Sequence, residues 1–153
     1  MTERGPRVQV LADAFAEGGA PDALIRALEA APQGGRITLL IHGYKYRPGH
    51  PARDPHRLLF GGGPEGARRC ADWADAVGGP TIGFGWDAWA RHLPSYVREG
   101  RNGFASVYER AGRAGEALGD LLQLIAARRP ALRPDVLAHS LGARVALGAA
   151  RRG

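Results

Sequence analysis

The sequence has little cysteine and no long apolar run, so it offers few means to cross-link the fold or to anchor it in a bilayer. Cys70 is the only cysteine of the 153 residues, which excludes an internal disulfide and a cysteine-based structural zinc site. The densest apolar run covers only residues 37–41, whereas a membrane span needs about 20 residues. The first ten residues include Glu3, Arg4 and Arg7 and no apolar stretch, unlike a secretory signal. We therefore expect a cytoplasmic protein with no membrane span.

Lysine is also nearly absent, and the charge is spread evenly. Lys45 is the only lysine among 21 basic residues, and with 15 acidic residues the net charge is +6. The excess of arginine is typical of a GC-rich genome. A nucleic-acid interface would need its arginines clustered with exposed aromatic residues, but here they are distributed along the whole chain. We expect no nucleic-acid partner, and a single domain over residues 1–153.

Strand and helix patterns alternate along the chain. The stretch 37–41 is apolar almost throughout, as in parallel strands that are buried on both faces. A long helix is indicated by apolar residues at helical spacing, including Phe104 and Tyr108. The pattern predicts strands at 37–41, 81–84 and 134–138, helices at 20–31, 67–77, 104–129 and from Gly142 onward, and a long loop at 43–66. This alternation predicts the α/β class, a three-layer sandwich with a mainly parallel sheet.

The strongest motif is Ala138-His139-Ser140-Leu141-Gly142, between the last predicted strand and the last helix. A sharp strand–turn–helix of this kind lifts a serine above the sheet in a strained backbone conformation. Neighbouring backbones come close two residues before and after the serine, and the small residues Ala138 and Gly142 suit that need. The turn also aims the N–H of Leu141 toward the place where an oxyanion would form.

A second motif, His42-Gly43-Tyr44, directly follows the strand 37–41. Gly43 allows a sharp turn, after which the N–H of Tyr44 would face the N–H of Leu141 across the serine hydroxyl. We interpret His42 as a buried structural histidine that bonds this loop, not as a general base. The two motifs together predict catalytic roles for Ser140, Tyr44 and Leu141.

The segments Leu39–Tyr44 and Ala138–Arg144 resemble the HGY and HSLGAR segments of a bacterial group of uncharacterised serine esterases (DUF900-like) in the α/β-hydrolase superfamily. A strand end at Phe84-Gly85-Trp86 is similar to one in that group. The resemblance covers residues 36–150, about the first half of a full domain, and Ala138 departs from the usual glycine. It implies that Ser140 is the nucleophile and that Tyr44 and Leu141 donate oxyanion N–H groups. It also implies an ester or thioester substrate and neither a cofactor nor a metal.

The residues after Ser140 include no acidic residue and no histidine, although the triad of this fold runs Ser, Asp or Glu, then His. All five histidines come earlier, namely His42, His50, His56, His92 and His139. We expect the chain to be the N-terminal portion of a longer catalytic domain, incomplete at its C-terminal side and by itself inactive. The other interpretation is a shortened protein that keeps the elbow without the triad.

Two further functions stay open. Residues 61–66 satisfy G-x-G-x-x-G, with a predicted strand at 58–60 before them and a helix after them, as in a dinucleotide-binding Rossmann-like domain, although Pro64 removes one N–H from such a cradle. The other alternative is a non-catalytic hydrolase-like module. If the protein is an esterase, Trp86 and Trp89 are candidates to line an acyl pocket. A basic loop would then favour anionic substrates through Lys45, Arg47, Arg53, His56 and Arg57.

Overall fold

The structure is a computed structural model that describes residues 7–61, 72–90 and 103–152. Its elements follow in the order β1 (Arg7–Leu11), α1 (Ala12–Gly18), α2 (Asp22–Ala30), β2 (Arg36–Ile41), α3 (Pro55–Leu58), α4 (Trp73–Val77), β3 (Thr81–Gly85), α5 (Gly103–Arg128), β4 (Arg133–Ala138) and α6 (Gly142–Ala150). The long helix stops before Pro130, as the sequence predicts, because proline cannot continue a helix.

The four strands form one parallel sheet in the order β1-β3-β2-β4. The two inner strands, β2 and β3, carry the strongest apolar patterns and are the most buried. The predicted α/β class and parallel sheet are therefore confirmed. The strand β1 and the helix α1 were not predicted. In β1, Arg7 and Gln9 interrupt a short apolar pattern, and this segment becomes a strand because it pairs with β3.

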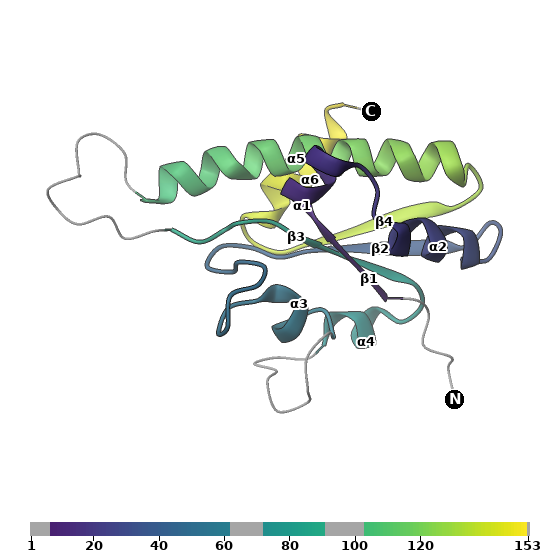
Figure 1. The fold of residues 1–153 in the computed structure, drawn as a ribbon, viewed down its shortest axis with the longest axis horizontal. Helices are drawn as coiled ribbons and strands as arrows, with labels where there is room; N and C mark the ends of the chain where they lie inside the picture. Colours follow the sequence, from purple (N-terminus) through teal and green to yellow (C-terminus); the bar gives the residue numbers. More distant parts are fainter. Residues whose placement is uncertain (1–6, 62–71, 91–102, 153) are drawn as a thin grey trace, which may run out of the picture.

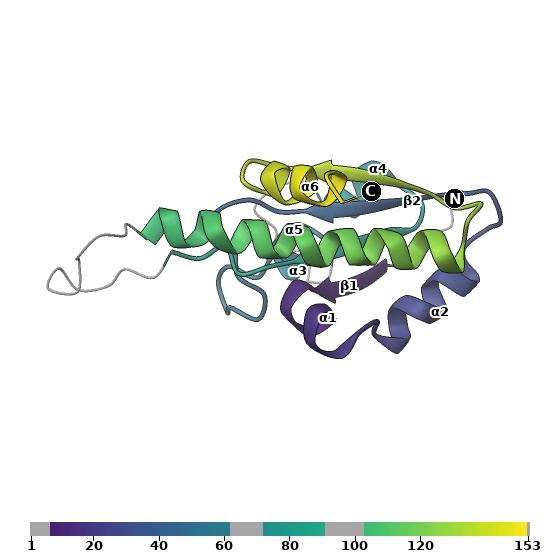
Figure 2. The same cartoon turned by 90° about the horizontal axis from the view of Figure 1, so that it is seen from above.

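Helices cover both faces of the sheet (Figure 1). One face packs against α1, α2, α5 and α6, with α5 running the length of the sheet and α6 beside it (Figure 2). Of the described residues, only the short helices α3 and α4 cover the other face, and their Leu58 and Ala74 pack with Leu40 in a smaller core. Because all four strands are parallel, their carboxyl ends meet at one edge of the sheet. Ligands bind at this edge in open α/β sheets.

Two glycines of β3 make room for this second layer. A Cβ at position 83 would lie 2.7 Å from the Phe60 ring, and one at position 85 would lie 2.6 Å from Nε2 of His56. The rings of Phe60 and His56 therefore sit directly on the backbone of β3. A side chain larger than hydrogen at either glycine would push this layer off the sheet.

The chain between β2 and β3 corrects three predictions. The loop predicted at 43–66 contains the helix α3, which Asp54 caps by accepting a hydrogen bond from the N–H of His56. The strand predicted at 58–60 is wrong, because Leu58 ends that helix, so the glycine-rich segment lacks the strand that a dinucleotide fingerprint requires. The helix predicted at 67–77 is confirmed over Trp73–Val77, but Asp72 is the extended cap before α4 and not part of it, and residues 62–71 lie outside the described part of the chain.

Asp72 is the residue that starts α4, and its replacement provides a test of this layer. Its buried side chain accepts hydrogen bonds from the N–H groups of Ala74 (2.9 Å) and Asp75 (3.4 Å) and contacts Arg7 Nη1 at 3.4 Å. We expect Asp72→Ala to lower the free energy of unfolding by about 1–2 kcal/mol in urea denaturation, because N–H groups of the first turn lose their acceptor. Asp72→Asn, which still caps, should cost clearly less, and equal losses for both would contradict the capping role.

Candidate active site

Ser140 lies at the turn between β4 and α6, at the carboxyl edge of the sheet. Its side chain is exposed, and its backbone has a φ of 54°, one of two positive values among the described residues other than glycine. Such a conformation costs a non-glycine residue about 1–3 kcal/mol and persists only where the surroundings enforce it. The turn therefore holds the Ser140 hydroxyl outside the core. An ordinary helix start would not require the positive φ that this residue adopts.

Gly43 is the first of the two residues that enforce the turn. A Cβ at position 43 would lie 2.7 Å from both the carbonyl oxygen of His139 and Cβ of Ser140, and 3.3 Å from Ser140 Oγ. The structure thus brings the His42-Gly43-Tyr44 segment directly against the serine. This contact joins positions separated by 97 residues in the chain.

Gly142 is the second residue that enforces the turn at Ser140. A Cβ there would lie 2.5 Å from the carbonyl oxygen of His42 and 2.7 Å from that of Ile41. The backbone after β4 also bonds to the end of β2, because the N–H of His139 donates to Ile41 O at 3.1 Å. The start of α6 consequently touches the end of β2 with no room for a side chain.

Next to Ser140 and Gly43, two backbone N–H groups have no acceptor within the described part of the chain. At the start of α6, the N–H groups of Gly142, Ala143 and Arg144 donate to the carbonyls three residues earlier. Among the described residues, however, no acceptor meets the N–H of Leu141 or that of Tyr44. Leu141 lies at the start of α6 and Tyr44 in the loop after β2, and backbone N–H groups without an acceptor are the kind of donor that stabilises an oxyanion.

His42 is fully buried beneath this loop, as its interpretation as a structural histidine requires. Its Nδ1 donates to Gly43 O at 2.9 Å, and its Nε2 accepts from the N–H of Trp86 at 3.1 Å. The indole Nε1 of Trp86 donates back to His42 O at 3.1 Å, and the two rings stack. Burial lowers the pKa of His42 to about 3, so the ring is neutral at pH 7. Both ring nitrogens are occupied, which leaves His42 no free base for the serine.

His139 is the other histidine close to Ser140 in the sequence. Its side chain is exposed and its ring faces Trp73 edge-on, with ring centroids 6.1 Å apart. Within the described part of the chain, no side chain hydrogen-bonds to Ser140 Oγ. The described residues therefore supply a hydroxyl and two N–H donors, without a base. His92 lies outside the described residues.

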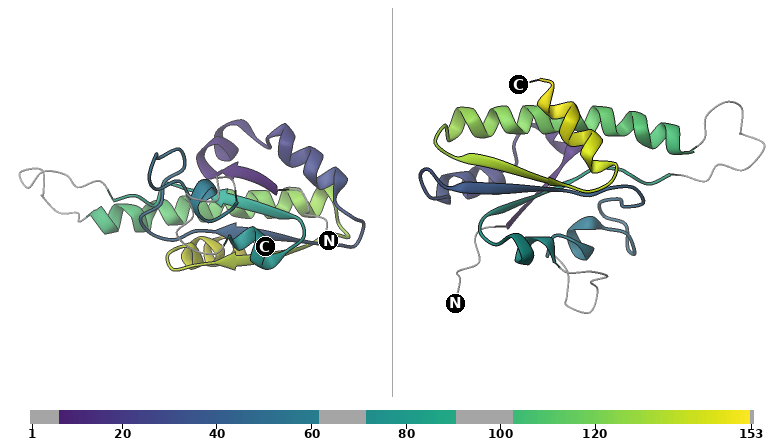
Figure 3. Two further views of the ribbon diagram at one scale, coloured as in Figure 1. Left: turned by 90° about the horizontal axis from the view of Figure 1, so that it is seen from below. Right: turned by 180° about the vertical axis from the view of Figure 1, so that it is seen from behind.

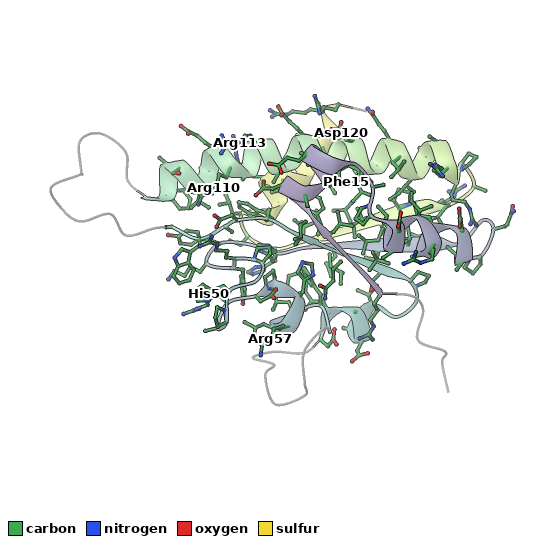
Figure 4. The ribbon with its side chains drawn as sticks, viewed as in Figure 1. Phe15, His50, Arg57, Arg110, Arg113 and Asp120 are labelled. Carbon is green, nitrogen blue, oxygen red and sulfur yellow. The ribbon has the colours of Figure 1, made fainter. Side chains whose placement is uncertain are left out.

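The tryptophans after β3 are placed differently from each other. Trp86 is buried against His42, so it supports the loop and does not line an open pocket. Trp89 is partly exposed and stacks on His50 at 5.1 Å, with the guanidinium of Arg53 5.8 Å from its ring. Arg110 of α5 holds this segment, donating to Asp87 O and Trp89 O at 2.8 and 2.6 Å (Figure 4).

The predicted basic loop is basic in part only. Arg57 donates to Pro51 O at 3.0 Å, and Figure 4 shows Arg57 and His50 in the region around α3. The prediction that His56 contributes to this basic loop is wrong, because its side chain is buried. Neither of its ring nitrogens has a hydrogen-bond partner among the described residues. Burial lowers its pKa, so it adds no positive charge at pH 7. The helical cap at Asp54 turns this histidine inward, which the sequence pattern does not reveal.

An aromatic row beside the serine was missed. Tyr44 packs edge-on against Phe104 at 5.5 Å, and Phe104 against Tyr108 at 6.3 Å. Their helical spacing indicates the buried face of the long helix, yet Phe104 is 48% and Tyr108 44% exposed. Phe104 is covered in part by Tyr44, and Tyr108 in part by the guanidinium of Arg144 from α6, so among the described residues both rings stay close to half exposed. The row gives the site an exposed apolar wall next to Tyr44.

Comparison of the chain with models of known protein families, with curated proteins and with solved structures finds no match. Over the described residues, no group of three or more histidine, cysteine or acidic side chains is placed to hold a metal ion. No helix in the same residues is both long and apolar enough to cross a bilayer.

Proposed function

We propose that Ser140 is the nucleophile of a serine hydrolase that cleaves carboxylic esters or thioesters, in an α/β-hydrolase-like fold. The observation that supports this most is the close approach of Gly43 and Gly142 around a serine with a φ of 54°. A serine that merely capped α6 would need neither contact nor a positive φ. The proposal assigns the oxyanion to the N–H groups of Tyr44 and Leu141, the residues next to Gly43 and Ser140, which have no acceptor among the described residues.

The reaction proceeds in two balanced steps. Ser140 Oγ bonds to the acyl carbon while the ester C–O bond breaks, and the proton from the hydroxyl leaves with the alcohol. Water then attacks the acyl-serine, releasing the acid and restoring the hydroxyl. The N–H groups of Tyr44 and Leu141 hold the negative oxygen formed in each step, and one such donor contributes about 2.7–4 kcal/mol to the barrier reduction.

The proposal requires a histidine base and an acidic partner. The hydrolase resemblance puts both later in the chain than Ser140, in the order Ser, acid, His. The outer strand β4 fits a larger sheet, because Val136 and Leu137 are exposed on its opposite faces, whereas parallel strands are normally buried on both. Further strands beside β4, together with the crossover helices that pack on both faces of a parallel sheet, would cover these side chains.

A fluorophosphonate probe applied to the natural full-length protein tests the nucleophile. We expect covalent labelling in wild type and its complete loss in Ser140→Ala, read by mass spectrometry of the labelled peptide. The matched control is Ser106→Ala on α5, which should label at the wild-type rate. Labelling that persists in Ser140→Ala would refute the assignment. Absence of labelling in folded wild type would instead favour a non-catalytic hydrolase-like module.

A further inference from the structure

A groove of about 480 Å³ runs between α5 and α6 on the outer side of the molecule. Figure 3 shows α6 lying across α5 from behind. The lining consists of Tyr108, Gly112, Glu116, Arg144, Leu147, Gly148, Arg151 and Arg152. Three of these side chains are cationic and one is anionic, so the groove carries a local charge of about +2, which suits a dianion.

Glycines on α5 bring the two helices and their arginines close together. A Cβ at Gly115 would lie 3.0 Å from Val145 O and 3.2 Å from Cα of Gly148, so the helix backbones nearly touch there. A Cβ at Gly112 would lie 4.0 Å from Nη2 of Arg144, and one at Gly119 would lie 3.4 Å from Cδ of Arg152. Because these positions of α5 are glycines, the side chains of Arg144 in α6 and of Arg152 just after it can lie across α5.

Arg144 is held in place before any ligand binds. Its Nε donates to Tyr108 O at 3.2 Å, its Nη1 donates to the Tyr108 hydroxyl at 2.9 Å, and its guanidinium lies 3.6 Å from the centre of that ring. Among the described residues nothing accepts from its Nη2. Because the Tyr108 oxygen is already the acceptor, its own O–H proton is available to a ligand.

The other two arginines differ in how far they are engaged. Arg152 Nη1 contacts Asp120 Oδ1 at 3.2 Å and Glu116 O at 3.4 Å, an exposed ion pair that contributes little. The Arg151 side chain makes no hydrogen bond or ion pair with any described residue. Figure 4 shows Asp120 on the outer side of α5, consistent with this exposed pair. Among the described residues, Arg151 is therefore a cation at the groove whose side chain has no hydrogen-bond or ion-pair partner.

We propose that this groove binds a small phosphomonoester. The phosphate, which carries about two negative charges at pH 7, accepts from Arg144 Nη2, the Tyr108 hydroxyl and Arg151. Arginine suits this role because its planar fork matches phosphate oxygens. The groove is larger than a phosphate alone, and Leu147, which is 65% exposed, offers an apolar surface to the organic part of the ligand.

Titration of the protein with phenyl phosphate by calorimetry tests the proposal. We expect saturable binding that weakens with salt, weaker binding of inorganic phosphate, and none of phenol. Arg151→Gln removes a side chain without contacts, so it should fold normally and bind about tenfold more weakly. The matched control Arg26→Gln, at an exposed position of α2, should bind as wild type.

Two outcomes would overturn the phosphate site. One is equal affinity for phenyl phosphate in wild type and Arg151→Gln, with Tyr108→Phe also unchanged. The other is binding only to phosphatidate vesicles and not to phenyl phosphate, which would indicate a lipid headgroup. Ser140→Ala should retain phenyl phosphate binding while losing fluorophosphonate labelling, so failure of this site is distinguishable from failure of the hydrolase proposal.

Discussion

Lowering the pH from 7 to 4.5 is expected to reduce the free energy of unfolding by about 2–3 kcal/mol through His42 alone. The pKa of His42 is about 3 in the folded chain, because the ring is buried, against 6.5 ordinarily. Between these two values the unfolded chain binds a proton that the folded chain does not. Stability is therefore fully present above pH 6.5 and falls as the pH decreases toward 3, by about 1.4 kcal/mol per pH unit. The lowered pKa of His56 acts in the same direction.

Urea denaturation at several pH values measures this dependence. His42→Gln keeps one donor and one acceptor but does not titrate, so its unfolding free energy should fall less steeply between pH 6.5 and 4.5. His139→Gln makes the same chemical change at an exposed histidine and is the control for the substitution itself. If wild type and His42→Gln show the same slope, His42 does not remain neutral in the folded protein.

Gly142→Ala is expected to destabilise the chain by about 3 kcal/mol, at the upper end for adding a methyl group to a packed position. The new Cβ would lie 2.5 Å from His42 O and 2.7 Å from Ile41 O. Both are backbone atoms at the end of a central strand, so they cannot move aside as a flexible side chain would. The start of α6 must shift, and the N–H of Leu141 shifts with it. Fluorophosphonate labelling of Ser140 should then fall by more than tenfold.

The matched control is Gly148→Ala, in the same helix. A Cβ at position 148 would lie 3.4 Å from Cα of Gly115, an ordinary contact. Alanine also has the higher helix propensity, so this variant should be neutral or slightly more stable. Thermal unfolding and labelling rates of both variants decide the matter. A Gly142→Ala protein with wild-type stability and labelling would contradict the close contact between α6 and β2.

Much of the site was predictable because its signals are local. The small residues around Ser140 and the glycine after His42 are required by backbone geometry within a few residues of each. That Gly43 touches Ser140 follows once two parallel strands are taken as neighbours, since their carboxyl ends share an edge. No local sequence signal among the described residues indicates a base for Ser140.

The burial or exposure of several side chains could not be predicted from the sequence. His56 stands among basic residues in a loop rich in glycine and proline, yet α3 turns it onto β3. Phe104 and Tyr108 have the spacing of a buried helix face, but both side chains are exposed in the structure. In each case burial depends on what stands opposite the residue, which its neighbours in the chain do not specify.

The sequence by itself determined where the strands β2, β3 and β4 and the long helix lie, because periodicity and the positions of glycine and proline act over short range. It also marked the turn at Ser140. Only the tertiary structure decided that β1 pairs with β3, that His42 and His56 are buried, and that Arg144 rests on Tyr108 beside the groove. These arrangements join residues far apart in the chain, and their free energy comes from packing and desolvation, which exist only once the layers have assembled.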